Sequence, residues 1–209
     1  RILIMSSIEK LAEIFSKFPG IGPRQSRRFV YFLLTKDREF LQDLSSSLLT
    51  LKKNIRVCEF CQRFYQSGNS NSKFCNICSD SNRNNHLLMV VEKDADLENI
   101  EKTEVYNGKY FVLGGIVPIL EEKPESKVRS RELVNLIEGE VKNNGLNEII
   151  LATSANPEGE NTHSYLLNLL RPITESGVKV STLGRGLSTG TELEYSDKDT
   201  LKAAFENRH

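Results

Sequence analysis

Apolar residues recur every three or four positions in several stretches near the start of the chain. Residues 7–18 predict an amphipathic helix, with Ser7 as its cap. Its apolar stripe consists of Ile8, Leu11, Ile14, Phe15 and Phe18. Residues 24–34 and 40–54 have the same periodicity and predict two further helices. The sequence Pro-Gly-Ile-Gly-Pro at residues 19–23 separates the first two helices, because Gly adopts turn conformations closed to other residues and Pro suits a first helical position.

Apolar runs of strand length alternate with helical patterns in the rest of the chain. The predicted strands are residues 87–91, 108–113, 148–153 and 178–183. The predicted helices between them are residues 97–102, 130–144 and 162–176. Gly145 is expected to end the second of these helices, and the polar residues 80–86 are expected to form a linker. Strands that alternate with helices predict a parallel sheet with helices on both faces, so we expect a multidomain α/β fold.

All cysteines of the chain lie in one segment, as two Cys-x2-Cys pairs. They are Cys58, Cys61, Cys75 and Cys78. This spacing suits tetrahedral Zn2+, and metal binding would supply the folding free energy that the short polar stretch between the pairs lacks. Two disulfides and a redox Cys-x-x-Cys motif are the alternatives, but nothing in the sequence suggests export and a redox motif needs only one pair. We therefore expect one structural zinc ion per chain, in a closed shell that does not catalyse.

The formal net charge is zero, but the charges are unevenly distributed. Residues 1–57 contain eleven Lys and Arg against five Asp and Glu, whereas residues 82–209 contain fifteen against twenty-one. The basic part suggests a polyanionic partner such as nucleic acid, with a merely solvated surface as the alternative. No apolar run reaches the roughly 20 residues that span a bilayer. Residues 1–7 do not resemble a signal peptide, so we expect a cytoplasmic, nucleoid-associated protein, and it stays open whether the natural chain starts at Met5.

The two helices around residues 19–23 have the layout of a helix-hairpin-helix. Gly20 and Gly22 would let backbone N–H groups at the start of the second helix approach a phosphate, which the helix dipole also attracts. Arg24 and Arg28 are one helical turn apart on the same face and could each contact a phosphate oxygen. Because such contacts read no base edges, we expect DNA binding that is independent of sequence and sensitive to salt.

Acidic residues follow the first and third predicted strands. They are Glu92, Asp94 and Asp96 after the first strand, and Glu158 and Glu160 after the third. The carboxyl ends of parallel strands meet at one edge of a sheet, where these side chains could hold Mg2+, form a solvated rim or receive a basic partner. Catalysis on nucleic acid would also need a nucleophile or two well-placed metal ions. No tyrosine or serine has a recognisable nucleophile setting, so Glu92, Glu158 and Glu160 are candidate partner contacts.

The glycine-rich residues 184–195 follow the last predicted strand. They lack the Gly-Lys-Ser/Thr ending of a phosphate-binding P-loop, so ATP binding is not expected. We expect this segment to contact another subunit.

Four motifs together resemble the RecR family of bacterial recombination mediators over nearly the whole chain. They are Phe-Pro-Gly-Ile-Gly-Pro-Arg at residues 18–24, the four cysteines, Leu-Ala-Thr-Ser-Ala-Asn-Pro-Glu-Gly-Glu at residues 151–160, and Gly-Leu-Ser-Thr-Gly-Thr-Glu-Leu-Glu-Tyr at residues 186–195. The resemblance implies a helix-hairpin-helix region (1–57), a zinc module (58–81), a Toprim domain (82–176) and a C-terminal oligomer-contact segment (177–209). Family members use basic residues that match Arg24 and Arg28 to contact DNA. They form ring-shaped tetramers around DNA and act with RecO and RecF to load RecA onto single-stranded DNA coated by single-strand-binding protein.

One departure from catalytic relatives bears on activity. Catalytic Toprim domains pair a strand-end glutamate, matched here by Glu92, with an Asp-x-Asp after a later strand. Residues 153–160 contain Glu158 and Glu160 but no Asp-x-Asp. We therefore expect a protein that is not an enzyme and whose acidic edge binds RecO. The alternative is a Mg2+-dependent Toprim-type nuclease or primase.

Overall fold

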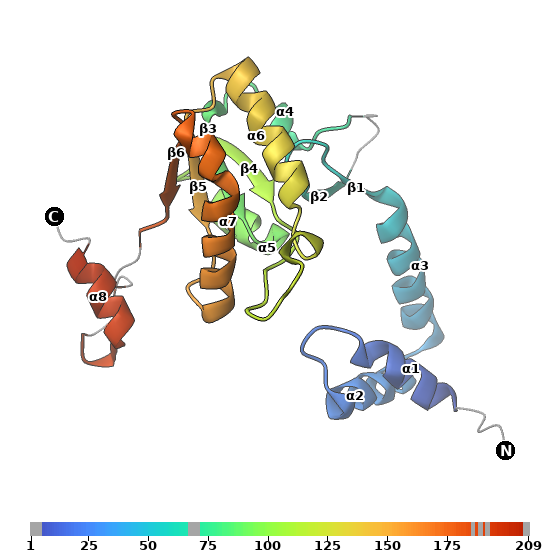
Figure 1. The fold of residues 1–209 in the computed structure, drawn as a ribbon. Helices are drawn as coiled ribbons and strands as arrows, with labels where there is room; N and C mark the ends of the chain where they lie inside the picture. The colour runs from blue at the N-terminus through green and yellow to red at the C-terminus, as the bar shows by residue number, and fades with distance from the viewer. Residues whose placement is uncertain (1–5, 67–71, 185–186, 188–189, 191–192, 207–209) are drawn as a thin grey trace. The chain divides into compact units, whose positions relative to one another are not determined.

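The structure, a computed structural model, describes residues 6–66, 72–184, 187, 190 and 193–206 (Figure 1). The chain divides into two units, Arg1–Ile55 and Arg56–His209. No described helix combines the length and the apolar character that a membrane span requires.

Helices make up most of the described part of the first unit. They are α1 (Ser7–Ser16), α2 (Pro23–Leu34) and α3 (Arg38–Asn54). The three predicted helices are thus confirmed, and Pro23 occupies the first position of α2 as expected. The predicted cap of α1 is wrong by one residue: the hydroxyl of Ser6 accepts from the Glu9 N–H, and the Glu9 carboxylate accepts from the Ser6 N–H. This reciprocal capping box satisfies donors at the helix start. α1 and α2 pack through the edge-to-face pair Phe15 and Phe29, with ring centroids 5.6 Å apart.

The second unit is organised around a parallel sheet. Its strands, in the spatial order β4-β3-β5-β6, are β4 (Gly108–Val112), β3 (Asn84–Val91), β5 (Glu148–Ala152) and β6 (Lys179–Thr182). Every pairing in it is parallel, and Val90 of β3 lies between Phe111 of β4 and Leu151 of β5. The predicted parallel sheet is confirmed. The linker predicted over residues 80–86 is wrong at its end, because β3 already begins at Asn84.

Shorter elements and helices complete this unit. They are β1 (Ile55–Val57), which begins on the last residue of the first unit, β2 (Phe64–Gln66), α4 (Asn76–Ser79), α5 (Asp94–Glu101), η1 (Pro124–Ser126), α6 (Ser130–Asn144), α7 (Pro157–Glu175), η2 (Leu193–Tyr195) and α8 (Lys198–Glu206). Strands β1 and β2 pair in a small separate sheet.

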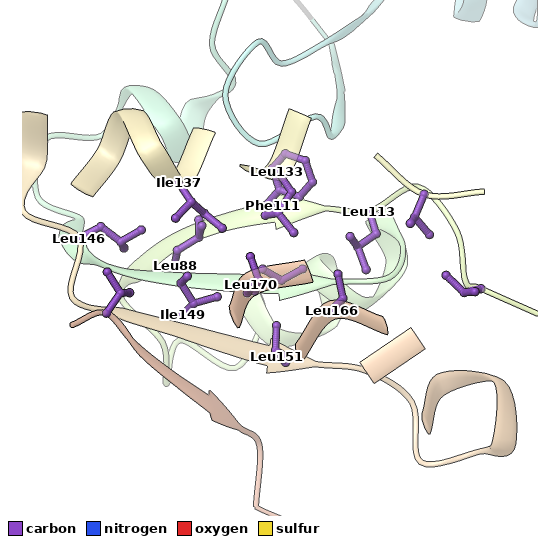
Figure 2. Packing of buried hydrophobic residues seen from close by; sticks show 14 residues of the cluster. Leu88, Phe111, Leu113, Leu133, Ile137, Leu146, Ile149, Leu151, Leu166 and Leu170 are labelled. Atoms are coloured by element: carbon purple, nitrogen blue, oxygen red, sulfur yellow. The ribbon is translucent and has the colours of Figure 1, made fainter. Parts of the chain in front are cut away.

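Alternate residues of each strand face two different layers of the core. Leu88 and Val90 of β3 pack with residues of α6 and α7 on one face, where Leu133 and Leu166 are fully buried. Figure 2 shows this apolar layer. Met89 on the opposite face packs with residues of α5 and with the cysteine segment. Helices therefore lie on both faces as predicted, and the cysteine segment shares the second face with α5.

The end of α6 and the start of α7 can be compared with the boundaries predicted from the sequence. Gly145 ends α6 in the left-handed region, with φ of 66°, as expected for a C-cap glycine. The predicted start of the last sheet helix at residue 162 is wrong, because α7 begins at Pro157. Asn156 caps α7 by accepting from the Gly159 N–H at 2.8 Å. An Asn-Pro pair is a helix-start signal in its own right.

Candidate functional site

The four cysteine sulfurs come together in the second unit. All of the Sγ atoms lie within 4.8 Å of one another, and Sγ of Cys61 is 3.6 Å from Sγ of Cys75. None of the four residues forms a disulfide. Four sulfurs about 2.3 Å from a tetrahedral zinc ion would be about 3.8 Å from one another, so the cluster has the size that such an ion requires. The prediction that these four cysteines cluster closely enough to hold a metal ion is confirmed.

Short turns place the sulfurs. The Cys58 N–H donates to the Arg63 carbonyl at 2.9 Å, and the Gln62 N–H donates to the Cys58 carbonyl at 3.0 Å. These bonds close a tight turn around the first pair of cysteines. The Cys75 N–H donates to Sγ of Cys58 at 3.4 Å, which joins the second pair to the first. Helix α4 then carries Cys78 into the cluster.

The crowded thiols have pKa values that move in opposite directions. A hydrogen bond with Cys61 lowers the pKa of Cys58, whereas a hydrogen bond with Cys58 raises the pKa of Cys78. Neighbouring thiolates repel one another, so without a cation some of these sulfurs must keep their protons. A divalent cation removes this conflict, because metal ligation requires thiolates.

Strand β4 forms hydrogen bonds with both cysteine pairs. The Val112 N–H in β4 donates to the Cys61 carbonyl at 2.8 Å. Nζ of Lys109, also in β4, donates to the Cys78 carbonyl at 2.9 Å. Nη1 of Arg129 donates to the Val112 carbonyl at 3.1 Å and to the carbonyl of the residue after Cys61 at 2.7 Å. The contacts of Lys109 and Arg129 with the cysteine segment were not predicted from the sequence, because their partners are 31 and 67 positions away.

The turn of the helix-hairpin-helix contains two glycines that differ in their conformation. Gly20 has φ of +75°, a conformation that residues with a Cβ rarely adopt. Gly22 is the N-cap of α2 and gives the helix start no side-chain hydrogen bond. A Cβ at Gly22 would meet no atom within 4 Å. Packing within the chain therefore does not require a glycine at this position, and the space beside the helix start is open.

Three arginines of α2 are exposed, and they differ in their surroundings. Arg27 lies near Glu9 of α1: hydrogen bonds with Ser6 lower the pKa of Glu9, and the charge of Arg27 lowers it further. Arg24 and Arg28 are exposed and, four positions apart, share one face of α2. The structure thus groups the two predicted arginines on one face. Arg27 has an acidic neighbour in its own unit, and Nη1 of Arg28 donates to Oε1 of Gln25 at 3.4 Å.

Glu92 lies directly after β3 and is only 2% exposed. Its Oε1 accepts from the Ser154 N–H at 2.9 Å, and its Oε2 accepts from the Ser154 hydroxyl at 2.7 Å. Both carboxylate oxygens are therefore engaged inside the protein, where they join the end of β3 to the end of β5. In this structure Glu92 does not present a carboxylate to a partner. Ser154 was missed in the sequence, because its hydrogen-bond partner lies 62 positions away.

The other two predicted carboxylates lie on the surface. Glu158 and Glu160 are exposed in the first turn of α7, where the helix dipole stabilises negative charge. A Cβ at Gly159, between them, would collide with the Ser154 carbonyl, so only glycine lets this turn approach the end of β5 so closely. The contact between Glu92 and Ser154 thus supports the turn that displays the two exposed acids.

A loop after β4 is attached to the same part of α7. The Val117 N–H donates to Oγ1 of Thr162 at 2.8 Å, and Nδ2 of Asn161 donates to the Val117 carbonyl at 3.0 Å. The loop continues with Ile119 and Leu120, whose exposed fractions are 58% and 93%. This exposed apolar pair, in a loop bonded to α7, was not foreseen from the sequence, because no periodic pattern marks it.

The carboxyl edge does not assemble a second metal-binding group among the residues that the structure describes. In that part of the chain, the group of His, Cys, Asp or Glu close enough to hold a metal ion is the four-cysteine cluster. A cavity of about 530 Å³ lies where β4 ends and α6 begins. Its charged lining residues are Lys127, Arg129, Arg131, Glu125 and Glu132. It contains none of the three predicted glutamates and has no excess of negative charge that would favour Mg2+.

A helix-hairpin-helix with an open helix start, a four-cysteine metal site and a parallel sheet define a class of multidomain DNA-binding proteins. Comparison with protein families places the chain within this class. A model of the RecR helix-hairpin-helix matches residues 8–52, a Toprim domain model matches residues 86–184, and a model of the RecR C-terminal region matches residues 186–209. Part of that last segment, including half of the motif at residues 186–195, lies outside the described residues.

Two curated relatives agree with these matches over almost their entire length. The chain is 36% identical over 203 residues to the Recombination protein RecR of Bifidobacterium longum subsp. infantis, which covers 97% of this chain and 95% of that protein. It is 36% identical over 202 residues to the protein of the same name from Chloroherpeton thalassium, covering 97% and 96%. The chain therefore belongs to the RecR family, as the sequence motifs indicated, and its role lies in DNA recombination and repair.

Proposed function

We propose that this protein is a non-catalytic DNA clamp that acts with RecO and RecF to load RecA onto single-stranded DNA coated by single-strand-binding protein. The observation that carries the DNA-binding part is the open start of α2, where Gly22 leaves room for a phosphate beside Arg24 and Arg28. Backbone N–H groups and the helix dipole attract an anion there. Each guanidinium group can also hold a phosphate oxygen. Such a site recognises the DNA backbone and not the bases.

Zn2+ is the metal that suits the cysteine cluster best. Four thiolates favour zinc over Mg2+ or Ca2+, which prefer oxygen ligands. Cys58, Cys61, Cys75 and Cys78 would fill a tetrahedral shell and leave no open position for a substrate, so the ion would be structural. Because β4 is hydrogen-bonded to both cysteine pairs, such an ion would brace the Toprim sheet at β4.

A non-catalytic Toprim edge fits the placement of the acids. Catalysis through Mg2+ needs carboxylate oxygens that converge on the ion. Both oxygens of Glu92 are occupied by Ser154, and Glu158 and Glu160 lie exposed on α7. The alternative, a Mg2+-dependent nuclease or primase, would require this edge to rearrange.

Our proposed contact for RecO consists of the exposed acids Glu158 and Glu160 in α7 and the exposed pair Ile119 and Leu120 in the loop that is hydrogen-bonded to α7. Carboxylates together with exposed apolar side chains suit a partner segment that is basic and amphipathic. We further propose that residues 177–209 contact other subunits in a cytoplasmic, tetrameric ring. The other proposed regions are the helix-hairpin-helix region (1–57), the zinc module (58–81) and the Toprim domain (82–176).

A loading assay tests this function. RecA is added to single-stranded DNA coated by single-strand-binding protein, and its DNA-dependent ATP hydrolysis is followed with RecO and this protein present. We expect the protein to shorten the lag before hydrolysis. The double variant Glu158→Gln, Glu160→Gln is expected to keep DNA affinity and to lose most of this gain, because its contact with the basic partner is weakened.

The matched control is Glu175→Gln, which removes an exposed carboxylate at the opposite end of α7 and is expected to behave like the wild type. A wild-type protein that leaves the lag unchanged would contradict the proposal. Mg2+-dependent cleavage or priming of DNA by the protein alone would favour the enzymatic alternative.

A further inference from the structure

Lys109 is a buried cation beside the cysteine cluster. It belongs to β4 and is 8% exposed. Its Nζ donates to the Cys78 carbonyl at 2.9 Å and lies 5.8 Å from the centre of the Phe60 ring. Both neighbours belong to the cysteine segment: Cys78 is one of the four cysteines, and Phe60 stands between the first two. The side chain of Lys109 therefore extends from the sheet to the metal site.

The charge of Lys109 has no carboxylate partner in the described part of the chain. The ion pairs found there, which join lysines or arginines to acids within 4.0 Å, do not include Lys109. A carbonyl and an aromatic ring offer only partial negative charge. A buried ammonium group is costly unless a negative charge lies nearby. The burial of Lys109 therefore indicates that a negatively charged group other than a carboxylate lies nearby.

The metal site supplies such a group. Four thiolates and one divalent cation carry a net charge of about −2, because each thiolate contributes one negative charge. Most of this charge is itself buried, since Cys58, Cys61 and Cys75 have no exposed surface and Cys78 is half-buried. Each of the two buried charges would stabilise the other across a medium of low polarity.

We propose that Lys109 is the counter-charge of the zinc–thiolate centre and determines how tightly the metal is held. This inference rests on the zinc assignment made above. Strand β4 would then have two roles at the metal site. The Val112 N–H positions the first cysteine pair by a hydrogen bond. Lys109 positions the second pair and neutralises part of the thiolate charge. Groups that support metal ligands in this way commonly change metal affinity by about 10- to 100-fold when they are removed.

Three substitutions at Lys109 separate the effect of its charge from the effect of its side-chain shape. Lys109→Met keeps the apolar stem and removes the charge, Lys109→Gln keeps a hydrogen-bond donor without charge, and Lys109→Arg keeps the charge. The rate of zinc release to a chelator is measured on the purified full-length proteins. We expect release to be about 10- to 100-fold faster from Lys109→Met and Lys109→Gln, and close to the wild-type rate from Lys109→Arg. The control is Lys73→Met, which removes a lysine that is nearer in sequence to Cys75 but exposed and paired with Glu59.

The outcomes distinguish this inference from the zinc assignment. Wild-type protein without zinc overturns both. Wild-type protein with zinc, and unchanged release from Lys109→Met and Lys109→Gln, overturns the role of Lys109 alone; so does equally fast release from Lys73→Met.

A measurement on the wild-type protein covers the case in which the uncharged variants do not fold. Acetylation of lysines is read by mass spectrometry before and after zinc removal. Lys109 is expected to be protected in the zinc-loaded protein and to become reactive after chelation, while Lys73 reacts equally in both. Unchanged protection of Lys109 after chelation would overturn the proposal.

Discussion

Replacement of Cys61 by Ser is expected to abolish zinc binding and to unfold the second unit. Structural zinc contributes about 10–16 kcal/mol to the folding of small zinc-binding peptides, which is comparable to the whole stability of a typical domain, about 5–15 kcal/mol. The cysteine segment is also part of the core, because it packs with Met89, Val91 and Tyr110 on one face of the sheet. Losing only about 5 kcal/mol would lower the melting temperature of a chain of this size by about 10–20 °C. Elemental analysis should find about one zinc per wild-type chain and none in the variant.

Glu59→Gln is the matched control for this substitution. Glu59 lies between Cys58 and Cys61, but its carboxylate pairs with Lys73 on the surface. Exposed ion pairs contribute at most about 1 kcal/mol, so the control should keep both zinc and melting temperature. A fully folded wild-type protein without metal would contradict the zinc assignment, and so would a Cys61→Ser variant that melts like the wild type.

Replacement of Arg24 and Arg28 by Ala is expected to weaken DNA binding by about 100-fold at low salt. A charge-assisted hydrogen bond contributes about 1.5–3 kcal/mol, and about 1.4 kcal/mol corresponds to a factor of ten. Affinity should fall equally for all DNA sequences, because the contacts are to phosphates. The slope of log affinity against log salt should become shallower by about one for each arginine. Fluorescence anisotropy over a series of salt concentrations measures both quantities.

Arg27→Ala is the internal control for the arginine pair. Arg27 is exposed on the same helix, but its charge acts on Glu9 of α1. We expect it to affect DNA affinity much less than either Arg24→Ala or Arg28→Ala. If the double variant binds DNA with wild-type affinity and salt dependence, the phosphate-binding role of this face of α2 is wrong.

Local signals in the sequence predicted the parts of this molecule that depend on neighbouring residues. Spacing alone was sufficient to group the four cysteines, because metal ligands in such modules come in close pairs. Gly145 was predictable as a helix end, because its left-handed conformation is a property of one residue. The alternation of strands and helices predicted the parallel sheet, because parallel strands need crossover connections.

Contacts between segments that are distant in the sequence could not be predicted from these local patterns. Glu92 was recognised as a strand-end acid, but its burial against Ser154 depends on how β3 and β5 meet. Lys109 was read only as part of a strand, whereas its side chain reaches Cys78. The start of α7 was predicted too late in the sequence, because the apolar periodicity becomes clear only further along the helix. Asn156 and Pro157 are a local signal for the true start.

We propose that this RecR-family protein encircles DNA without reacting with it. Retention on DNA of different topology tests this most directly, with the protein bound at low salt and then challenged with high salt, which screens the arginine–phosphate contacts. A ring around DNA should remain on closed-circular DNA, slide off linear DNA of the same sequence, and leave both uncut in the presence of Mg2+. Equal loss from the circular and the linear form, or cleavage of either, would contradict it.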